Sequence, residues 1–236
     1  MAIVSYLNNY IFIKTKKTGG TTVEMTLAPS CGPQDVITPL NGPEELLRGK
    51  GEPLCRNFAS SQEVETSLRA AMIAKDRSAP LIRKRVDKNS DFFTHMTAAD
   101  VKRLVAPDFW DQSTKITIER HPYEKAVSRA YFNYQNDQPF EQYLDTVVSE
   151  GRYASYRFYT VEGKVVVDDF LKLETLHEDL TRVGKKLGVS IPDQLVHAKG
   201  RRRIDKRPAR EILTSAQKDK IYEVCQLEFD LLGYQR

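Results

Sequence analysis

The stretch of sequence that decides the fold runs from Asn9 to Leu27 and reads NYIFIKTKKTGGTTVEMTL. Its first part, Asn9 to Lys14, is short, aromatic and β-branched, which is typical of a strand. A glycine-containing turn follows from Lys17 to Thr22, and the residues from Thr22 to Leu27 are compatible with a helix. A strand, a turn of this kind and a helix, in this order, open a phosphate-binding α/β domain.

The turn itself has the residue types that bind phosphate or sulfate. Its glycines let successive backbone N–H groups face one point, the helix that follows adds partial positive charge, and its hydroxyl groups add donors. It is not a Walker A loop, because that motif places its lysine after the glycines, whereas Lys17 precedes them. An ordinary β-to-α turn remains the alternative on spacing alone. The candidate binding residues are Lys17, Thr18, Gly19, Gly20, Thr21 and Thr22.

Outward from this stretch, apolar periodicity and turn residues divide the chain into further strands and helices. The expected strands are Lys115–Glu119, Val165–Lys172 and a short one at Asp91–His95. The expected helices follow Ser60, Thr97, His121, Thr175 and Thr214. Residues 28–56 are rich in proline and glycine and are expected to form a loop. Because strands alternate with helices, the sequence predicts an α/β fold with a mainly parallel central sheet flanked by helices.

A second candidate site runs from Glu119 to Ser128 and reads ERHPYEKAVS. A strand ends next to Arg120, and Pro122 opens a helix, because its missing N–H costs nothing at a first helical position. Ser128 lies two turns into this helix and off its apolar stripe. An arginine fork beside a hydroxyl group recognises phosphate well. The alternative is a surface ion pair and a solvated serine.

Composition excludes several classes of protein. The 236 residues suit one large domain, and no stretch approaches the roughly 18 apolar residues of a membrane span. The first ten residues do not form a secretory signal, so we expect a soluble cytoplasmic protein. Three cysteines and four histidines are scattered, so neither a disulfide framework nor a metal site is expected. A net charge of +4 is too low to predict nucleic acid as the main partner, although basic clusters suit a small polyanion.

Together, the two candidate segments resemble the elements of the sulfotransferase superfamily that bind 3′-phosphoadenosine 5′-phosphosulfate (PAPS). The second element of that family is an arginine, seven residues and a serine, which Arg120 and Ser128 match. Asp169–Glu174 and Phe229–Tyr234 resemble stretches of the bacterial carbohydrate-type branch. The resemblance implies a P-loop-like three-layer fold and a single sulfotransferase domain over residues 1–236. It does not extend over residues 28–85, and residues 28–90 would be a variable insertion on the acceptor side.

The resemblance implies a role for each matching residue. Lys17 would contact the oxygen between phosphate and sulfuryl group, and residues 18–22 would hold the 5′-phosphate. Arg120 and Ser128 would hold the 3′-phosphate, and the run of Arg201, Arg202 and Arg203 would form a lid over it, with a solvated basic loop as the alternative. The donor would be PAPS and the product adenosine 3′,5′-bisphosphate (PAP). The acceptor would offer a hydroxyl group or an amine, and a carbohydrate is favoured over a small molecule or a peptide. Related proteins commonly have a proline before the loop lysine, where this chain has Lys16.

A general base must take the proton of the attacking hydroxyl group, and His95 is the best candidate. Its unperturbed pKa near 6.5 suits proton removal at neutral pH. Glu119, Asp91 and Glu63 are weaker alternatives, and His121 is expected to be structural.

Two other classes of protein remain open at this point: a P-loop-like kinase or nucleotide-binding protein, and a non-catalytic module that binds polyanions.

Overall fold

The computed structural model describes residues 2–82, 84, 91–196 and 203–236. Five strands of this part of the chain form a central sheet in the order β3-β1-β2-β4-β7. Strand β2 pairs with β4 in parallel, and β4 pairs with β7 in parallel, whereas β1 runs antiparallel to both of its neighbours. The strands are β1 (Ala2–Ser5), β2 (Tyr10–Ile13), β3 (Val36–Ile37), β4 (Thr114–Glu119) and β7 (Asp169–Lys172). The α/β class with a mostly parallel sheet is therefore confirmed.

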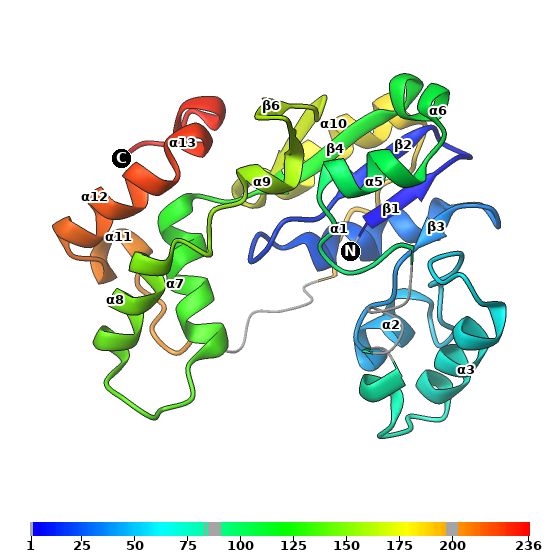
Figure 1. Ribbon diagram of the computed structural model, residues 1–236, viewed down its shortest axis with the longest axis horizontal. Coiled ribbons are helices and arrows are strands. Elements are labelled where there is room, and N and C mark those ends of the chain that lie inside the picture. The colour runs from blue at the N-terminus through cyan, green and yellow to red at the C-terminus, as the bar shows by residue number, and fades with distance from the viewer. Residues whose placement is uncertain (1, 83, 85–90, 197–202) are drawn as a thin grey trace.

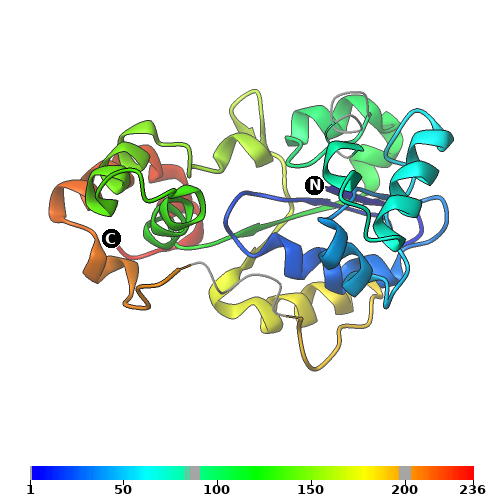
Figure 2. The ribbon, with the colours of Figure 1, turned by 90° about the horizontal axis from the view of Figure 1, so that it is seen from below.

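Helices cover both faces of this sheet, so the architecture has three layers (Figure 1 and Figure 2). Tyr10 and Phe12 of β2 face a core shared with α1 (Gly20–Leu27) and α10 (Leu176–Leu187). Ile11 and Ile13 face the opposite core. Its helices are α3 (Gln62–Ile73), α5 (Ala98–Leu104), α6 (Pro107–Gln112) and α9 (Tyr156–Tyr159). Strand β2 is buried at all four positions because both of its faces are covered.

A separate group of helices packs beside the end of the sheet and has a core of its own (Figure 1, left). The group consists of α7 (Pro122–Asn133), α8 (Phe140–Glu150), α11 (Ala209–Ile212), α12 (Ser215–Val224) and α13 (Gln226–Leu232). On the other side of the molecule, α2 (Gly42–Arg48) packs near α3. Two short strands, β5 (Thr160–Val161) and β6 (Lys164–Val165), form a small antiparallel hairpin.

Several sequence expectations about local structure are wrong. Asp91–His95 forms bends and turns rather than a strand, and His95 has a φ of 60°, which extended backbone does not allow. The expected strand at residues 165–172 is two strands, because the chain turns between β6 and β7. Residues 28–56 contain a short 3₁₀ helix (Ala28–Ser30), β3 and α2, so they are not simply a loop. The C-terminal helix breaks at Cys225 into α12 and α13.

The helix starts were predicted better than their capping interactions. Thr97 and Thr214 form complete capping boxes with Asp100 and Gln217. Helix α3 instead begins after Ser61 without a side-chain cap, and α10 begins after Thr175 without one. The spacing of capping residues therefore located these helices correctly, but it predicted the hydrogen bonds in only some of them.

A buried ionic network joins the end of β4 to the separate group of helices. Lys125 of α7 is fully buried, and its Nζ lies 2.8 Å from Oε2 of Glu119 and 3.6 Å from Oε1 of Glu228. It also donates to Oγ of Ser155 at 3.0 Å. Burial raises the pKa of Glu119, and Lys125 opposes this rise. The network fixes α7, and with it the residues that follow β4, because an unpaired charge at this depth is costly.

Replacing Lys125 tests this network. Lys125→Met should lower the free energy of unfolding by about 3 kcal/mol or more, because two buried carboxylates lose their cation. Urea denaturation at pH 7 measures the change. Lys220→Met, which removes an exposed ion pair with Glu223 on α12, is the matched control and should stay within about 0.5 kcal/mol of the original protein. Equal effects of the two substitutions would show that the network is not a stabilising element.

Candidate functional site

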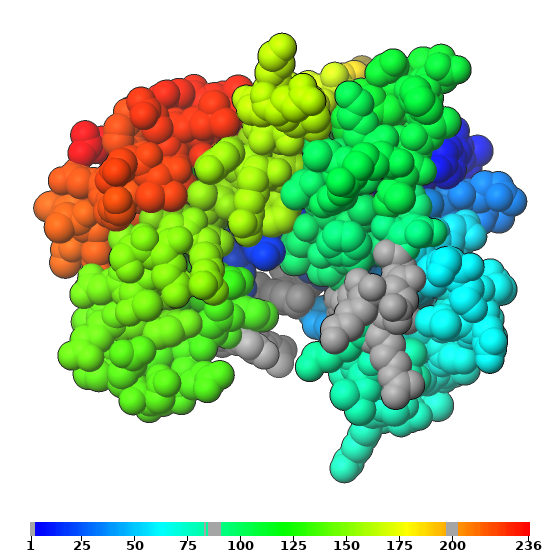
Figure 3. Space-filling view, in the orientation of Figure 1, coloured from blue at the N-terminus to red at the C-terminus, as the bar shows by residue number. Residues whose placement is uncertain are grey.

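A pocket of about 610 Å³ lies where the parallel strands β2, β4 and β7 end. Figure 3 shows a hollow between the α7–α8 side and the α2–α3 side of the molecule, with blue atoms from the first part of the chain at its top. The carboxyl edge of parallel strands is where α/β proteins bind ligands. The lining residues are Lys14, Thr15, Lys16, Lys17, Gly19, Gly20, Thr21, Thr22, His95, Arg120, Ser128, Arg129, Phe132 and Leu173.

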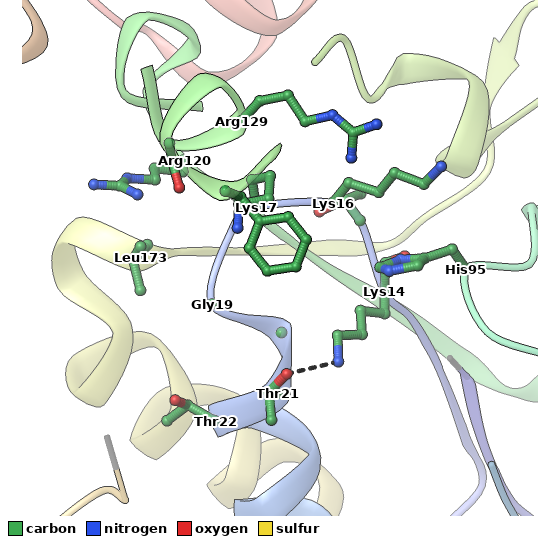
Figure 4. Close-up of a pocket in the computed structure, with 14 residues that line it drawn as sticks. Lys14, Lys16, Lys17, Gly19, Thr21, Thr22, His95, Arg120, Arg129 and Leu173 are labelled. Atoms are coloured by element: carbon green, nitrogen blue, oxygen red, sulfur yellow. Dashed lines mark hydrogen bonds between the residues drawn. The ribbon is translucent and has the colours of Figure 1, made fainter. Parts of the chain in front are cut away.

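The loop between β2 and α1 is held by the buried Lys14. Its Nζ lies 2.6 Å from Oε2 of Glu24 and donates to Oγ1 of Thr21 at 2.9 Å (Figure 4). The aliphatic stem of Lys14 packs against Gly20, where an added Cβ would lie 2.6 Å from Cγ of Lys14. Gly19 has a φ of 88°, a conformation that glycine adopts without strain. The loop therefore needs both glycines, and its position depends on the ion pair between Lys14, which follows β2, and Glu24 of α1.

Lys17, the residue expected at the leaving group, lines the pocket. Its Nζ lies 3.7 Å from the centroid of the Phe132 ring on α7, which is within the range of a cation–π contact. Lys17 lies in the middle of the pocket in Figure 4. The backbone of Lys17 has a φ of 65°, so the loop turns sharply at this residue.

The threonines of the turn differ in what they can offer a ligand. Thr18 is fully buried, its Oγ1 pairs with Oγ1 of Thr15 at 2.9 Å, and it does not line the pocket. Thr21 accepts a hydrogen bond from Lys14, and Thr22 donates one to the backbone oxygen of Val196 at 3.1 Å. The turn can therefore bind an anion mainly through the N–H groups at the start of α1.

Arg120 and Ser128 both line the same pocket, as their spacing predicted for a common site. Nη2 of Arg120 lies 2.9 Å from Oε2 of Glu124, and the same carboxylate contacts Nη1 of Arg203 at 2.6 Å. Burial lowers the pKa of the Arg120 guanidinium, and Glu124 opposes this decrease. Arg203 is thus tied to the Arg120 side of the pocket, whereas Arg201 and Arg202, which were expected to add to that site, lie outside the described residues.

His95 reaches the pocket from the segment that precedes α5. Its Nδ1 lies 3.3 Å from the backbone oxygen of Lys14. Because a carbonyl oxygen can only accept, Nδ1 carries the proton in this contact and Nε2 keeps its lone pair. Burial, together with positive charge nearby that includes Lys14 and Lys16, lowers the pKa of His95 to about 2. This pKa lies far below the unperturbed value of an imidazole, so His95 is neutral at physiological pH.

The other titratable candidates lie elsewhere. His121 accepts a hydrogen bond from the backbone N–H of Tyr123 and so caps α7, as expected for a structural histidine. Glu119 is enclosed with Lys125, whereas Asp91 and Glu63 are exposed. None of these three carboxylates lines the pocket.

Sequence reasoning did not predict six residues of the lining as site residues: Lys14, Thr15, Lys16, Arg129, Phe132 and Leu173. Phe132 lies four residues after Ser128 on the same helix, so the helical period of α7 could have placed it near the site. Arg129 is adjacent to Ser128 in sequence, and the helical period does not put neighbouring residues on one face. Leu173 comes directly after β7, and the end of a parallel strand was an available signal. The internal ion pair of Lys14 with Glu24 has no signal of comparable strength in the sequence.

Comparison with known proteins identifies no relative: no family model, no curated protein and no solved structure matches the chain. Within the described ranges, no helix has the length and apolar character needed to cross a membrane. The same residues contain no group of three or more His, Cys, Asp or Glu side chains that could hold a metal ion.

The contact between Gly20 and Lys14 yields a prediction about the loop. Gly20→Ala should lower the free energy of unfolding by about 1–3 kcal/mol, because the new Cβ would force the Lys14 stem away from Glu24. Gly42→Ala is the matched control, since Gly42 is also the first residue of a helix and has open space around it. This control should be neutral or stabilising by up to about 1 kcal/mol. Denaturant unfolding of both variants checks the difference, and no loss in Gly20→Ala would contradict the packing described above.

Proposed function

We propose that this protein is a PAPS-dependent sulfotransferase with a P-loop-like fold, and that it transfers a sulfuryl group to a hydroxyl group of a carbohydrate. One observation carries the proposal: two segments about 100 residues apart in sequence, the turn after β2 and the Arg120–Ser128 pair, line one pocket. Each segment alone has an ordinary structural explanation. Their meeting in one cavity supports a ligand with two separate anionic groups, which PAPS has.

The charges of the lining support the binding of anionic ligands. Its five cationic side chains are Lys14, Lys16, Lys17, Arg120 and Arg129, and no carboxylate lines the described part of the pocket. Glu24 and Glu124 each neutralise one of these cations from outside the lining. A small-molecule pocket of several hundred Å³ accommodates a nucleotide-sized ligand. In the proposed complex, the start of α1 binds the 5′-phosphate, and Arg120 with Ser128 binds the 3′-phosphate.

The proposed reaction is an in-line displacement at sulfur. An oxygen of the acceptor forms a bond to sulfur while the bond from sulfur to the bridging phosphate oxygen breaks, and PAP leaves with the electron pair. Lys17 stabilises the negative charge that develops on this leaving oxygen. The acceptor proton passes to Nε2 of His95. Positioning supplies much of the acceleration, as in phosphoryl transfer.

With so low a pKa, His95 is too weak a base for this role in the free protein. It can act as a base only if its pKa rises when the donor is bound. Part of the decrease comes from cations such as Lys14 and Lys16. A bound donor brings several negative charges against the same cations and so opposes their effect on the imidazole. We therefore expect the pKa of His95 to rise in the donor complex, which would make the residue a base at the stage when a base is required.

The two competing classes have weaker support. A kinase that uses ATP and Mg²⁺ needs carboxylate ligands for the metal, and the described lining has none. It would also need the lysine of a Walker A loop after the glycines. A module that binds polyanions on its surface does not require a neutral histidine beside a glycine turn inside a pocket.

Calorimetric titration with PAP is the experiment that tests the proposal. The protein should bind PAP with a micromolar Kd and bind ATP much more weakly. Arg120→Ala should weaken PAP binding by about tenfold or more, because a charge-assisted contact with the 3′-phosphate is worth about 1.5–3 kcal/mol. The same substitution should leave the affinity for adenosine 5′-monophosphate, which has no 3′-phosphate, unchanged.

The matched control for Arg120→Ala is Arg103→Ala, because Arg103 also pairs with an acid on its own helix but lies away from the pocket. It should not change the Kd for PAP. Tighter binding of ATP than of PAP, or an unchanged Kd for PAP in Arg120→Ala, would contradict the proposed donor site.

Lys17→Ala should separate binding from chemistry. We expect PAP formation from PAPS, measured with a pool of neutral and acidic oligosaccharides as acceptors, to fall by about 10²–10³-fold. The Kd for PAP should rise by no more than about tenfold, because only one contact to the 5′-phosphate is lost and the N–H groups of α1 remain. Lys102→Ala, at an exposed position on α5, should retain full turnover. Near-normal turnover in Lys17→Ala would remove Lys17 from the proposed mechanism.

A further inference from the structure

Lys16 and Arg157 lie near the ring of Phe158 on α9, and the charge of Arg129 also acts on Lys16. Nζ of Lys16 lies 5.6 Å from the centroid of this ring, and the guanidinium carbon of Arg157 lies 5.1 Å from it. Lys16 and Arg129 line the pocket itself. Phe158 is buried, so the ring is a fixed support for the two cations near it. We call Lys16, Arg129 and Arg157 the second cation cluster, to distinguish them from Lys14 and Arg120, the cations of the pocket that form ion pairs.

The members of this cluster lack the carboxylate partners that other cations of the pocket have. Lys14 pairs with Glu24 and Arg120 pairs with Glu124. Within the described residues, by contrast, none of the three members of the cluster forms an ion pair. Burial lowers the pKa of Lys16, and the charges of Arg157 and Arg129 lower it further. Like charges held together without counter-ions favour the binding of an anion between them.

The cluster lies on the side of the pocket where an acceptor would meet the proposed base. In Figure 4 the side chains of Lys16 and Arg129 extend toward the side of His95, whereas Arg120 extends in the opposite direction. The rings of His95 and Phe158 have centroids 6.3 Å apart. An anion bound by the cluster would therefore lie near His95 and away from the Arg120 contact proposed for the 3′-phosphate.

We propose that the second cation cluster binds an anionic group of the acceptor, and that the acceptor is consequently an acidic carbohydrate. The inference rests on the proposed function, because His95 marks the acceptor side only if the protein transfers a sulfuryl group from PAPS. The anionic group is a carboxylate or an ester sulfate. Either one would be held by two or three charge-assisted hydrogen bonds, which fix the position of the neighbouring hydroxyl group relative to the base.

Calorimetry with the PAP-saturated protein tests this subsite. Three hexasaccharides of alternating hexose-type units serve as probes: one with carboxylates, its carboxyl-reduced neutral counterpart, and the neutral form carrying ester sulfates. At least one acidic probe should bind about tenfold or more tightly than the neutral one, in line with two charge-assisted contacts. A preference for one acidic probe identifies carboxylate or sulfate as the recognised group.

Three substitutions assign the preference to the cluster. Lys16→Gln, Arg129→Gln and Arg157→Gln should each reduce the preference for the acidic probe to about threefold or less, since each removes one of its charged contacts. The Kd for PAP should stay the same within error in Arg129→Gln and Arg157→Gln. Arg152→Gln is the control, because Arg152 is an exposed arginine that precedes α9 and pairs with Glu150.

The outcomes separate this inference from the proposed function. Equal affinity for acidic and neutral probes, with PAP bound normally, would overturn the acidic acceptor and leave the sulfotransferase proposal in place. Loss of PAP affinity in Arg129→Gln and Arg157→Gln would assign the cluster to the donor and would also overturn the inference. Failure of the original protein to bind PAP at all would overturn the proposed function, and the acceptor subsite with it.

Discussion

The parallel pairing of β2, β4 and β7 is the constraint on which the pocket depends. Ile13 pairs with Thr117, and Glu119 pairs with Lys172, so the three strands end within a few residues of one another at the same edge. Each strand then delivers a different part of the lining: the glycine turn after β2, Arg120 after β4 and Leu173 after β7. Residues far apart in sequence meet because a parallel register brings their strand ends together.

Charge compensation then divides the cations of the pocket into two groups. Lys14 is paired with Glu24, and Arg120 is paired with Glu124, which also holds Arg203. These ion pairs fix the positions of the side chains and reduce the repulsion between the cations of the pocket. The cluster of Lys16, Arg129 and Arg157 has no such compensation in the described residues. The molecule therefore presents a pre-organised anion site and, beside it, charges that an incoming ligand would neutralise.

Local sequence signals predicted the parts of this fold that depend on neighbouring residues. The strand, turn and helix from Asn9 to Leu27 and the helix opened by Pro122 were all located correctly. Strand β1 was missed, because a run of four residues gains its stability from pairing on both edges. The burial that lowers the pKa of His95 comes from non-local packing. Spacing could place Arg120 and Ser128 in one site, but it could not reveal Arg129 or the ion pair of Lys14.

The most direct test of the central claim is a crystal structure of the protein with PAP bound. The account predicts the 5′-phosphate at the first N–H groups of α1, beside Gly19 and Gly20, and the 3′-phosphate within hydrogen-bond distance of Arg120 and Ser128. It also predicts that Lys17 Nζ leaves the Phe132 ring for the 5′-phosphate oxygen from which the sulfuryl group would be transferred. PAP bound in another cavity, or bound with its 3′-phosphate at the glycine turn, would contradict the account.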